Sequence, residues 1–413
     1  MSSKKLFKPI VYLLLSCLLS TSLVGCNNEP TDIVNPNPNQ VTGKEMDEKF
    51  IDNSMRLAIE LFKKTHDSKE NSLISPLSIT IALAMTTNGA DNETLRQMQT
   101  TLGKDISIED LNEYLYTYIK NLPSTDKAKF HLANSIWFKD ADSFNVNEQF
   151  LQTNADYYQA QLYKEPFNNE TVNKINQWVK ENTLGMIDKI INELSSDAVM
   201  VLLNALAFEA DWERPYDLEQ VFDGPFTNIN GKEITVDMMH SKESSYLEDE
   251  NTIGFIKPYV GGTYSFVALL PCADIDIETY ISELTADKIQ KLLDNPQTTS
   301  VIATLPKFSY SFETSMNEIL EGMGITEAFS PDKADFSKLS DNKTYISEVI
   351  HKTFIQVDEL GTKAGAVTSV TMNTTAAPIE DKIVTLDRPF IYMIIDQDTN
   401  LPIFIGTVLD IQK

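Results

Sequence analysis

The chain has 413 residues, of which 42% are hydrophobic and 9% aromatic, so it carries enough apolar material for a large core and is not a disordered protein. Its formal net charge of −26 excludes nucleic acid and anionic lipid as partners of its bulk surface. We expect a monomer that folds without a partner.

The first 25 residues predict a signal peptide. A basic start precedes an apolar stretch, residues 10–19, which is too short to span a bilayer. The sequence Leu-Val-Gly-Cys, ending at Cys26, resembles a bacterial lipobox, in which cleavage precedes the cysteine and two acyl chains are attached to it. The alternative, ordinary secretory cleavage, would use an Ala-x-Ala-like site, which this segment lacks. We therefore expect a bacterial outer-membrane lipoprotein, anchored through Cys26 and placed at the cell surface or facing the periplasm.

The mature chain begins with a segment unlike the rest. Residues 26–45 are rich in Asn and Pro with almost no large apolar side chain, which predicts a disordered tether. Residues 46–413 form the predicted globular domain. Cys272 is the other cysteine of the mature chain, and because Cys26 is acylated we expect no disulfide.

Within the globular domain, helical patterns come first and strand patterns follow. Apolar residues recur at helical spacing from Phe50 to Phe62, and residues 78–102 read as a helical region interrupted near Gly89. Runs rich in β-branched and aromatic residues between turn formers predict strands at residues 131–138, 199–208, 264–271, 352–359, 390–396 and 402–409. This order favours an α+β fold with large, mostly antiparallel sheets.

The sequence contains no familiar catalytic motif. It lacks the G-x-S-x-G, H-E-x-x-H, P-loop and G-x-G-x-x-G patterns, and its four histidines are far apart, with no pair at metal-ligand spacing. Spacing alone does not exclude a triad assembled from distant residues. We expect a protein that is not an enzyme and holds no metal or cofactor.

The segment from Asp358 to Asp381 has an unusual composition. Between Glu359 and Glu380 its one charged residue is Lys363, and most of the others are small. With the period of two that a strand imposes, one face from Thr362 onward is free of charge and begins with small side chains. This pattern suits a strand that slides into an existing sheet. An ordinary edge strand is the alternative, although it would not require so many small residues.

The sequence around this segment resembles the serpins, a family of suicide protease inhibitors. Glu359-Leu-Gly-Thr-Lys-Ala-Gly-Ala is similar to the hinge of the serpin reactive-centre loop, and the resemblance covers residues 46–413. Further stretches that resemble serpin signatures occur in the family's order: Asn71–Ser78, Asn134–Phe138, Ile175–Val179 with Thr183–Gly185, Asn204 with Asp211–Pro215, Leu305–Phe308, Asp387–Phe390 and Phe404–Gly406. The resemblance implies the serpin fold, with helices, three mostly antiparallel sheets and an exposed reactive-centre loop at about 359–381.

The resemblance also implies roles for particular residues. The loop hinge would consist of Glu359, Gly361, Thr362, Ala364 and Ala366. A polar cluster called the shutter would hold two strands of the main sheet together in its middle; the matching residues are Ser75, Ser78, Asn204 and His351. A second cluster at the top of that sheet, the breach, would comprise Trp212, Lys307 and Glu359, with Lys307 and Glu359 paired.

In serpins the target protease cleaves the loop and forms an acyl-enzyme, after which the cut loop inserts into the main sheet and distorts the enzyme. Counting sixteen positions from Glu359 predicts Thr375–Ala376 as the scissile bond, with Met372, Asn373, Thr374 and Ala376 as alternatives for the bait residue. A small neutral residue there favours elastase-like or subtilisin-like serine proteases, with papain-like cysteine proteases as a further class.

Some positions depart from the family pattern. Leu360 replaces a usual acidic residue, Gly365 and Val367 replace common alanines, and the loop is slightly long. The competing hypothesis is a non-inhibitory serpin that acts as a surface binding protein or chaperone. Such members often carry bulky, charged or proline residues in the hinge, so the small hinge residues of this chain favour inhibition.

Overall fold

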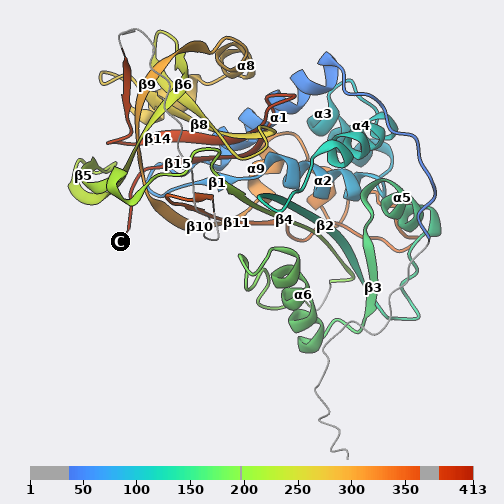
Figure 1. Ribbon diagram of the computed structural model, residues 1–413. Coiled ribbons are helices and arrows are strands. Elements are labelled where there is room, and N and C mark those ends of the chain that lie inside the picture. The colour runs from blue at the N-terminus through green and yellow to red at the C-terminus, as the bar shows by residue number, and fades with distance from the viewer. Residues whose placement is uncertain (1–36, 196–197, 363–380, 413) are drawn as a thin grey trace, which may run out of the picture.

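The computed structural model describes residues 37–195, 198–362 and 381–412, arranged as two β-sheets with helices packed around them (Figure 1). The helices are α1 (Glu48–Thr65), α2 (Pro76–Thr87), α3 (Asn92–Gly103), α4 (Ile108–Asn121), α5 (Glu148–Tyr158), α6 (Asn169–Asn182), α7 (Ile277–Glu283), α8 (Ala286–Asp294) and α9 (Asn317–Gly322), with 3-10 helices η1 (Leu218–Gln220) and η2 (Glu327–Phe329). Among the described residues, no helix is long and apolar enough to cross a membrane.

The first sheet carries the candidate site. Its strands follow the order β10 (Phe308–Ser315), β11 (Ile350–Val357), β12 (Gly361–Thr362), β4 (Met200–Asp211), β2 (Ala128–Lys139) and β3 (Gln161–Glu165). Neighbours are antiparallel except β2 and β3, which are parallel. Because β12 is antiparallel to both β11 and β4, these two longer strands run parallel to each other on either side of it.

The second sheet forms much of the core. Its order is β1 (Leu73–Ile74), β15 (Pro402–Val408), β14 (Phe390–Asp396), β8 (Tyr264–Pro271), β7 (Thr252–Pro258), β6 (Glu233–Glu248), β9 (Gln297–Pro306) and β13 (Lys382–Thr385), with β5 (Val221–Thr227) also paired to β6. The expected three sheets are therefore two by hydrogen bonding, because the 16-residue β6 pairs with β5, β7 and β9 and joins them into one sheet. The mostly antiparallel α+β fold is confirmed.

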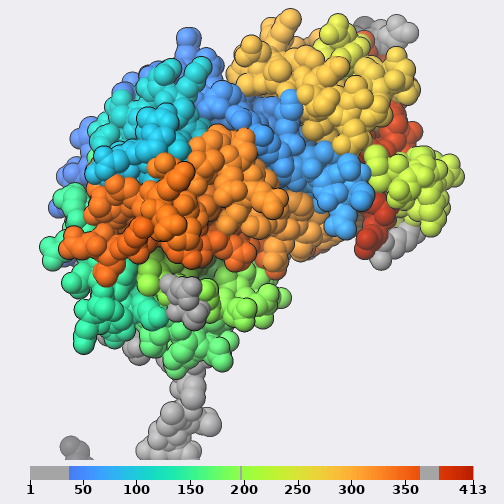
Figure 2. All heavy atoms as spheres, turned by 180° about the vertical axis from the view of Figure 1, so that it is seen from behind, coloured from blue at the N-terminus to red at the C-terminus, as the bar shows by residue number. Residues whose placement is uncertain are grey.

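Helices cover the two faces of the first sheet. The central helix α2 is apolar on all sides and packs against β4 and β15, so it lies between the two sheets. On the opposite face, α6 places Trp178 and Ile175 against Leu203 of β4 in a separate apolar cluster. Seen from behind, the chain between β10 and β11 forms an orange band between the blue-cyan helices and the green segment around α6 (Figure 2).

The described part of the chain begins with an extended segment that contacts the helices. Residues 37–47 precede α1 without regular structure, and Asn39 hydrogen-bonds to Asp156 of α5. Further along, the Lys44 ammonium pairs with Asp110 of α4 at 2.9 Å. The later part of the expected tether therefore lies against α4 and α5, while residues 26–36, Cys26 included, fall outside the described residues.

Candidate functional site

The candidate site is the junction of β4 and β11, which β12 separates at one end. Thr362 pairs with Val357 of β11 and Ala210 of β4, and Gly361 pairs with Asp211. A Cβ atom on Gly361 would lie 2.0 Å from the carbonyl oxygen of Ala210, so only glycine allows the backbone to approach β4 this closely. The start of the hinge is thus already a strand of the sheet.

Side chains of the breach hold this short strand in place. The Trp212 backbone N–H donates to the carbonyl oxygen of Leu360 at 2.8 Å, and its indole Nε1–H donates to that of Asp358 at 2.9 Å. The Lys307 ammonium lies 2.6 Å from the Glu359 carboxylate. Burial opposes ionisation of Glu359, but the hydrogen bond from Lys307, a backbone hydrogen bond and the charge of Lys307 together outweigh it and lower the pKa of the carboxyl below its usual value.

Three further residues take part in this contact that sequence reasoning did not single out. The hydroxyl groups of Thr362 and Tyr259 lie 2.5 Å apart, and the Tyr259 ring stacks on Trp212 at 4.5 Å between centroids. Beneath Trp212, the buried ammonium of Lys257 is paired with Glu243 at 2.7 Å. Burial lowers the pKa of Lys257. No local motif marks these residues, because they reach the hinge from β6 and from the end of β7.

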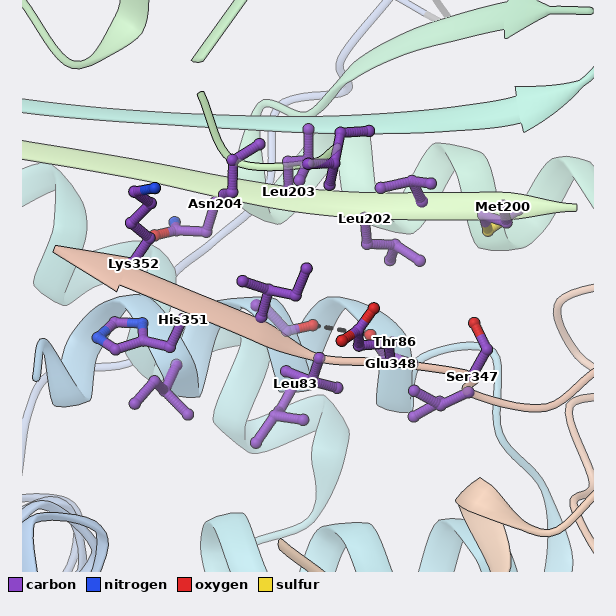
Figure 3. Close-up of a pocket in the computed structure, with 18 of the residues that line it drawn as sticks. Leu83, Thr86, Met200, Leu202, Leu203, Asn204, Ser347, Glu348, His351 and Lys352 are labelled. Carbon is purple, nitrogen blue, oxygen red and sulfur yellow. Dashed lines mark hydrogen bonds between the residues drawn. The ribbon is translucent and has the colours of Figure 1, made fainter. Parts of the chain in front are cut away.

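Beyond β12, the two long strands border a cavity. It has a volume of about 290 Å³ and lies between β4 and β11 over α2. Figure 3 shows Asn204, Leu202 and Met200 along β4, His351 and Lys352 on β11, and Leu83 and Thr86 on the floor. Among the described residues, no strand joins β4 to β11 at this level. The sheet therefore has room for additional strand residues below Thr362.

The four shutter residues lie together at this cavity. The Ser78 hydroxyl hydrogen-bonds to the Asn204 side-chain oxygen, and the Asn204 amide donates to Asn134 of β2 at 2.8 Å. The backbone N–H of Ser75 donates to His351 Nε2 at 3.1 Å. Ser75 also caps α2, because its hydroxyl accepts the Ser78 N–H. Helix α2 is thereby tied to β4 through Asn204 and to β11 through His351.

Burial sets the charge of His351. The side chain is 6% exposed, and desolvation lowers its pKa to about 4. The ring is therefore neutral at physiological pH, which leaves Nε2 free to accept the hydrogen bond from Ser75. The link between α2 and β11 depends on this neutral form.

Five residues of the candidate site and anchor lie outside the described part of the chain. They are Ala364 and Ala366 of the hinge, the bait residues Thr375 and Ala376, and the lipidation site Cys26. Within the described residues, no group of acidic, histidine and cysteine side chains could hold a metal ion.

Comparison with known proteins agrees with this arrangement. The family model described as serpin, serine protease inhibitor, matches residues 52–411, and the chain therefore belongs to the serpin family. A curated relative, the leukocyte elastase inhibitor of Xenopus laevis, is 31% identical over 365 residues, which cover 84% of this chain and 95% of the relative.

Several solved structures are also similar to this chain. Native tengpin, a thermophilic serpin, is 55% identical with a TM-score of 0.88, covering 92% of this chain and 100% of that one. Its latent state gives 54% identity and a TM-score of 0.82, covering 90% and 100%. Thyroxine-binding globulin in complex with thyroxine is 26% identical with a TM-score of 0.78, covering 88% and 100%. The family thus includes a ligand-binding globulin as well as protease inhibitors.

Proposed function

We propose that this chain is a suicide-type inhibitor of serine proteases, with papain-like cysteine proteases as a further target class. The observation that carries the proposal is an incomplete strand position between β4 and β11 in the first sheet. A two-residue strand already lies between β4 and β11, and the cavity between the same two strands extends from it to the shutter residues. A loop cut by a protease could complete this strand.

The register of β12 indicates where the rest of the loop would lie after cleavage. Continued without a shift, it sets residue 364 between Ile355 and Phe208, and residue 368 between His351 and Asn204. Cross-strand partners share a face of the sheet, and Ile355 and Phe208 are buried. Even-numbered loop residues would therefore face the core, where only small side chains fit without displacing α2.

Insertion supplies the driving force for trapping the enzyme. About ten new ladder hydrogen bonds at about 1 kcal/mol each, together with apolar burial, give on the order of 10 kcal/mol. The acyl-enzyme bond forms before insertion, and its hydrolysis, deacylation, would release active protease. Insertion must therefore be faster than deacylation. Small residues at the hinge favour this outcome because they need little desolvation.

Incubation with neutrophil elastase followed by a denaturing gel tests the proposal. We expect an SDS-stable complex with the mass of the inhibitor plus the protease, less that of the C-terminal peptide released by cleavage, because the acyl bond survives denaturation. Elastase whose active serine has been blocked is the control and should form none. Clean cleavage without a complex would instead support the non-inhibitory alternative, a surface binding protein or chaperone.

We further propose that the target enzymes are elastase-like or subtilisin-like, which rests on Thr375–Ala376 as the bait bond. Small neutral residues suit shallow apolar specificity pockets and fit poorly into a pocket that carries a carboxylate. The mass of the peptide released on cleavage, measured by mass spectrometry, identifies the bond that the protease cuts. A cut more than three residues from Thr375 would contradict the assignment.

A separate proposal concerns location. We infer that the chain is an outer-membrane lipoprotein, because the lipobox-like sequence ends at Cys26 and a polar segment separates it from the domain. Cys26→Ala should move the protein from the membrane fraction to the soluble fraction, since two acyl chains are what hold it. Unchanged sedimentation with membranes would contradict the anchor.

A further inference from the structure

An apolar row runs across the outer face of the second sheet at β5, β6, β9 and β13. Among the described residues, five large hydrophobic side chains are exposed, and four of them belong to this sheet or to η1, which leads into it: Leu218, Phe222, Ile302 and Ile383. Such a concentration is unusual, because exposed hydrophobic residues are normally scattered singly.

The row is continuous from strand to strand. The ring of Phe222 lies flat on the imidazole of His240, with centroids 3.8 Å apart, and His240 Nδ1 is 3.0 Å from the Thr304 hydroxyl. Ile302 is two residues from Thr304 on the same face of β9 and pairs across the ladder with Ile383. We call Phe222, Ile302 and Ile383, which are connected through His240 and Thr304, the apolar row.

The core of the protein does not require the row. The residues that alternate with it, Val301, Ala303 and Val384, are fully buried and face the interior, while Phe222 is 51% and Ile383 63% exposed. Charged pairs flank the row, with Lys242 and Asp381 3.2 Å apart and Lys382 and Glu248 3.5 Å apart. An apolar centre with a polar rim is the usual anatomy of a protein interface.

The place of the row in the chain indicates what covers it. This step rests on the proposed function. Ile383 is seven residues after Ala376, so the chain between them spans at most about 25 Å when fully extended. A protease of about 220 residues has a radius of gyration of about 17 Å, so its body extends about 20 Å around a bond held in its cleft. Because about 25 Å is the limit for a fully extended chain, a path even one fifth shorter brings β13 within reach of the body of the attacking enzyme.

We propose that the apolar row is an exosite, an accessory contact for the body of the protease that attacks the loop. It selects enzymes that carry an apolar surface beside the active-site cleft. Because the row lies outside the insertion site, it acts on the encounter between the two proteins and leaves the later partition between trapping and release unchanged.

The test compares the unchanged protein with the triple variant Phe222→Ser, Ile302→Ser, Ile383→Ser. We expect the second-order rate constant for complex formation with neutrophil elastase to fall about tenfold or more, because truncated apolar anchors weaken the encounter complex by such factors. Lys232→Ser, in the turn between β5 and β6, is the control and should leave the rate unchanged. The stoichiometry of inhibition should be the same for all three proteins.

The possible failures are distinguishable. If the triple variant reacts as fast as the unchanged protein, the exosite is wrong and the proposed function stands. If the unchanged protein forms no complex, the proposed function fails and the exosite with it. If sedimentation shows a dimer that the triple variant loses, the row binds a second copy and the proposal is overturned. If the triple variant melts at a lower temperature, the single variant Phe222→Ser decides the test. Its second-order rate constant for complex formation should fall about threefold.

Discussion

Thr362 is the residue at which the loop meets the sheet. It is 3% exposed, and its hydroxyl is bound to Tyr259, so the first residue on the uncharged face of the loop already points into the core. The Tyr259 ring, which follows β7 of the second sheet, stacks on Trp212, which follows β4 of the first sheet, and covers this contact. A single side chain therefore links the hinge to Tyr259, at the end of β7 in the second sheet.

Thr362→Arg should convert the proposed inhibitor into a substrate. An arginine at this buried position should expel β12 from between β4 and β11, and its return to the sheet would require desolvation of the guanidinium at a cost of several kcal/mol, so insertion becomes slower than deacylation. We expect the bait bond to be cut as before while active protease is released. The stoichiometry of inhibition measures this partition.

Lys363→Arg is the matched control. Continued from β12, the ladder register places residue 363 between Gln356 and Glu209, on the opposite face from Thr362 and outside the apolar cluster under α6, so an arginine there would remain in solvent after insertion. We expect this variant to trap protease normally. Equal loss of trapping in both variants, or loss with Lys363→Arg alone, would show that the register is wrong.

His351 makes the native sheet sensitive to acid. The pKa of the folded side chain is about 4, below the value near 6.5 of an unfolded histidine, so between these pH values the unfolded chain binds a proton that the folded chain does not. The free energy of unfolding therefore decreases as the pH falls through this window, by up to about 3 kcal/mol.

His351→Gln should reduce this dependence. Glutamine keeps an acceptor for the Ser75 N–H but does not titrate. The melting temperature should fall less between pH 7 and pH 5 in the variant than in the unchanged protein. His131→Gln, at an exposed histidine of β2, is the control and should retain the full decrease. Parallel pH profiles for the unchanged protein and His351→Gln would contradict the role of His351.

At the scale of elements, β12 depends on one glycine. Gly361→Ala places a methyl group against the carbonyl of Ala210, where backbone cannot move aside cheaply, so β12 should leave β4. We expect faster hydrogen exchange at the amide and indole N–H groups of Trp212, which donate to Leu360 and Asp358. Gly322→Ala is the control, because its nearest neighbour is 3.9 Å away. Unchanged exchange in Gly361→Ala would show that β12 does not depend on this contact.

Most elements were predictable because their patterns are local. The predicted strand at residues 264–271 coincides with β8, and the region from 78 to 102 divides at the expected break into α2 and α3. Helix α2 begins where Ser75 caps it and Pro76 follows, which are local signals as well. Periodicity and capping act within one turn or one strand, so sequence reasoning reaches them.

The partners of the hinge were less accessible to sequence reasoning. Lys307 and Glu359 could be paired only through the family resemblance, and Tyr259 and Lys257 were missed altogether. These residues meet because residues in or just after β7 and β9 of the second sheet contact the ends of β4 and β11 of the first, and no local pattern encodes a contact between two sheets. The merging of β5, β7 and β9 through the length of β6 was missed for the same reason.

At the scale of the whole molecule, the two sheets differ in how completely they are packed. The second sheet is complete and carries a continuous core from β15 to β9. The first sheet contains a strand of two residues and a cavity of about 290 Å³ between β4 and β11. Such a void forfeits packing contacts, so the sheet is not at its most stable arrangement. In the proposed mechanism, the free energy that insertion releases is stored in the first sheet, and the second sheet supports it.

Cleavage of the loop should release this free energy. Once the loop is cut, its hinge side can continue β12 between β4 and β11, filling the cavity and adding on the order of 10 kcal/mol of hydrogen bonding and burial. For a chain of this size such a gain raises the melting temperature by on the order of 10 °C. Calorimetry of intact and nicked protein measures the change. Thr362→Arg, nicked in the same way, should gain much less, because its first inward side chain resists burial; if intact and nicked protein melt together, the loop does not insert.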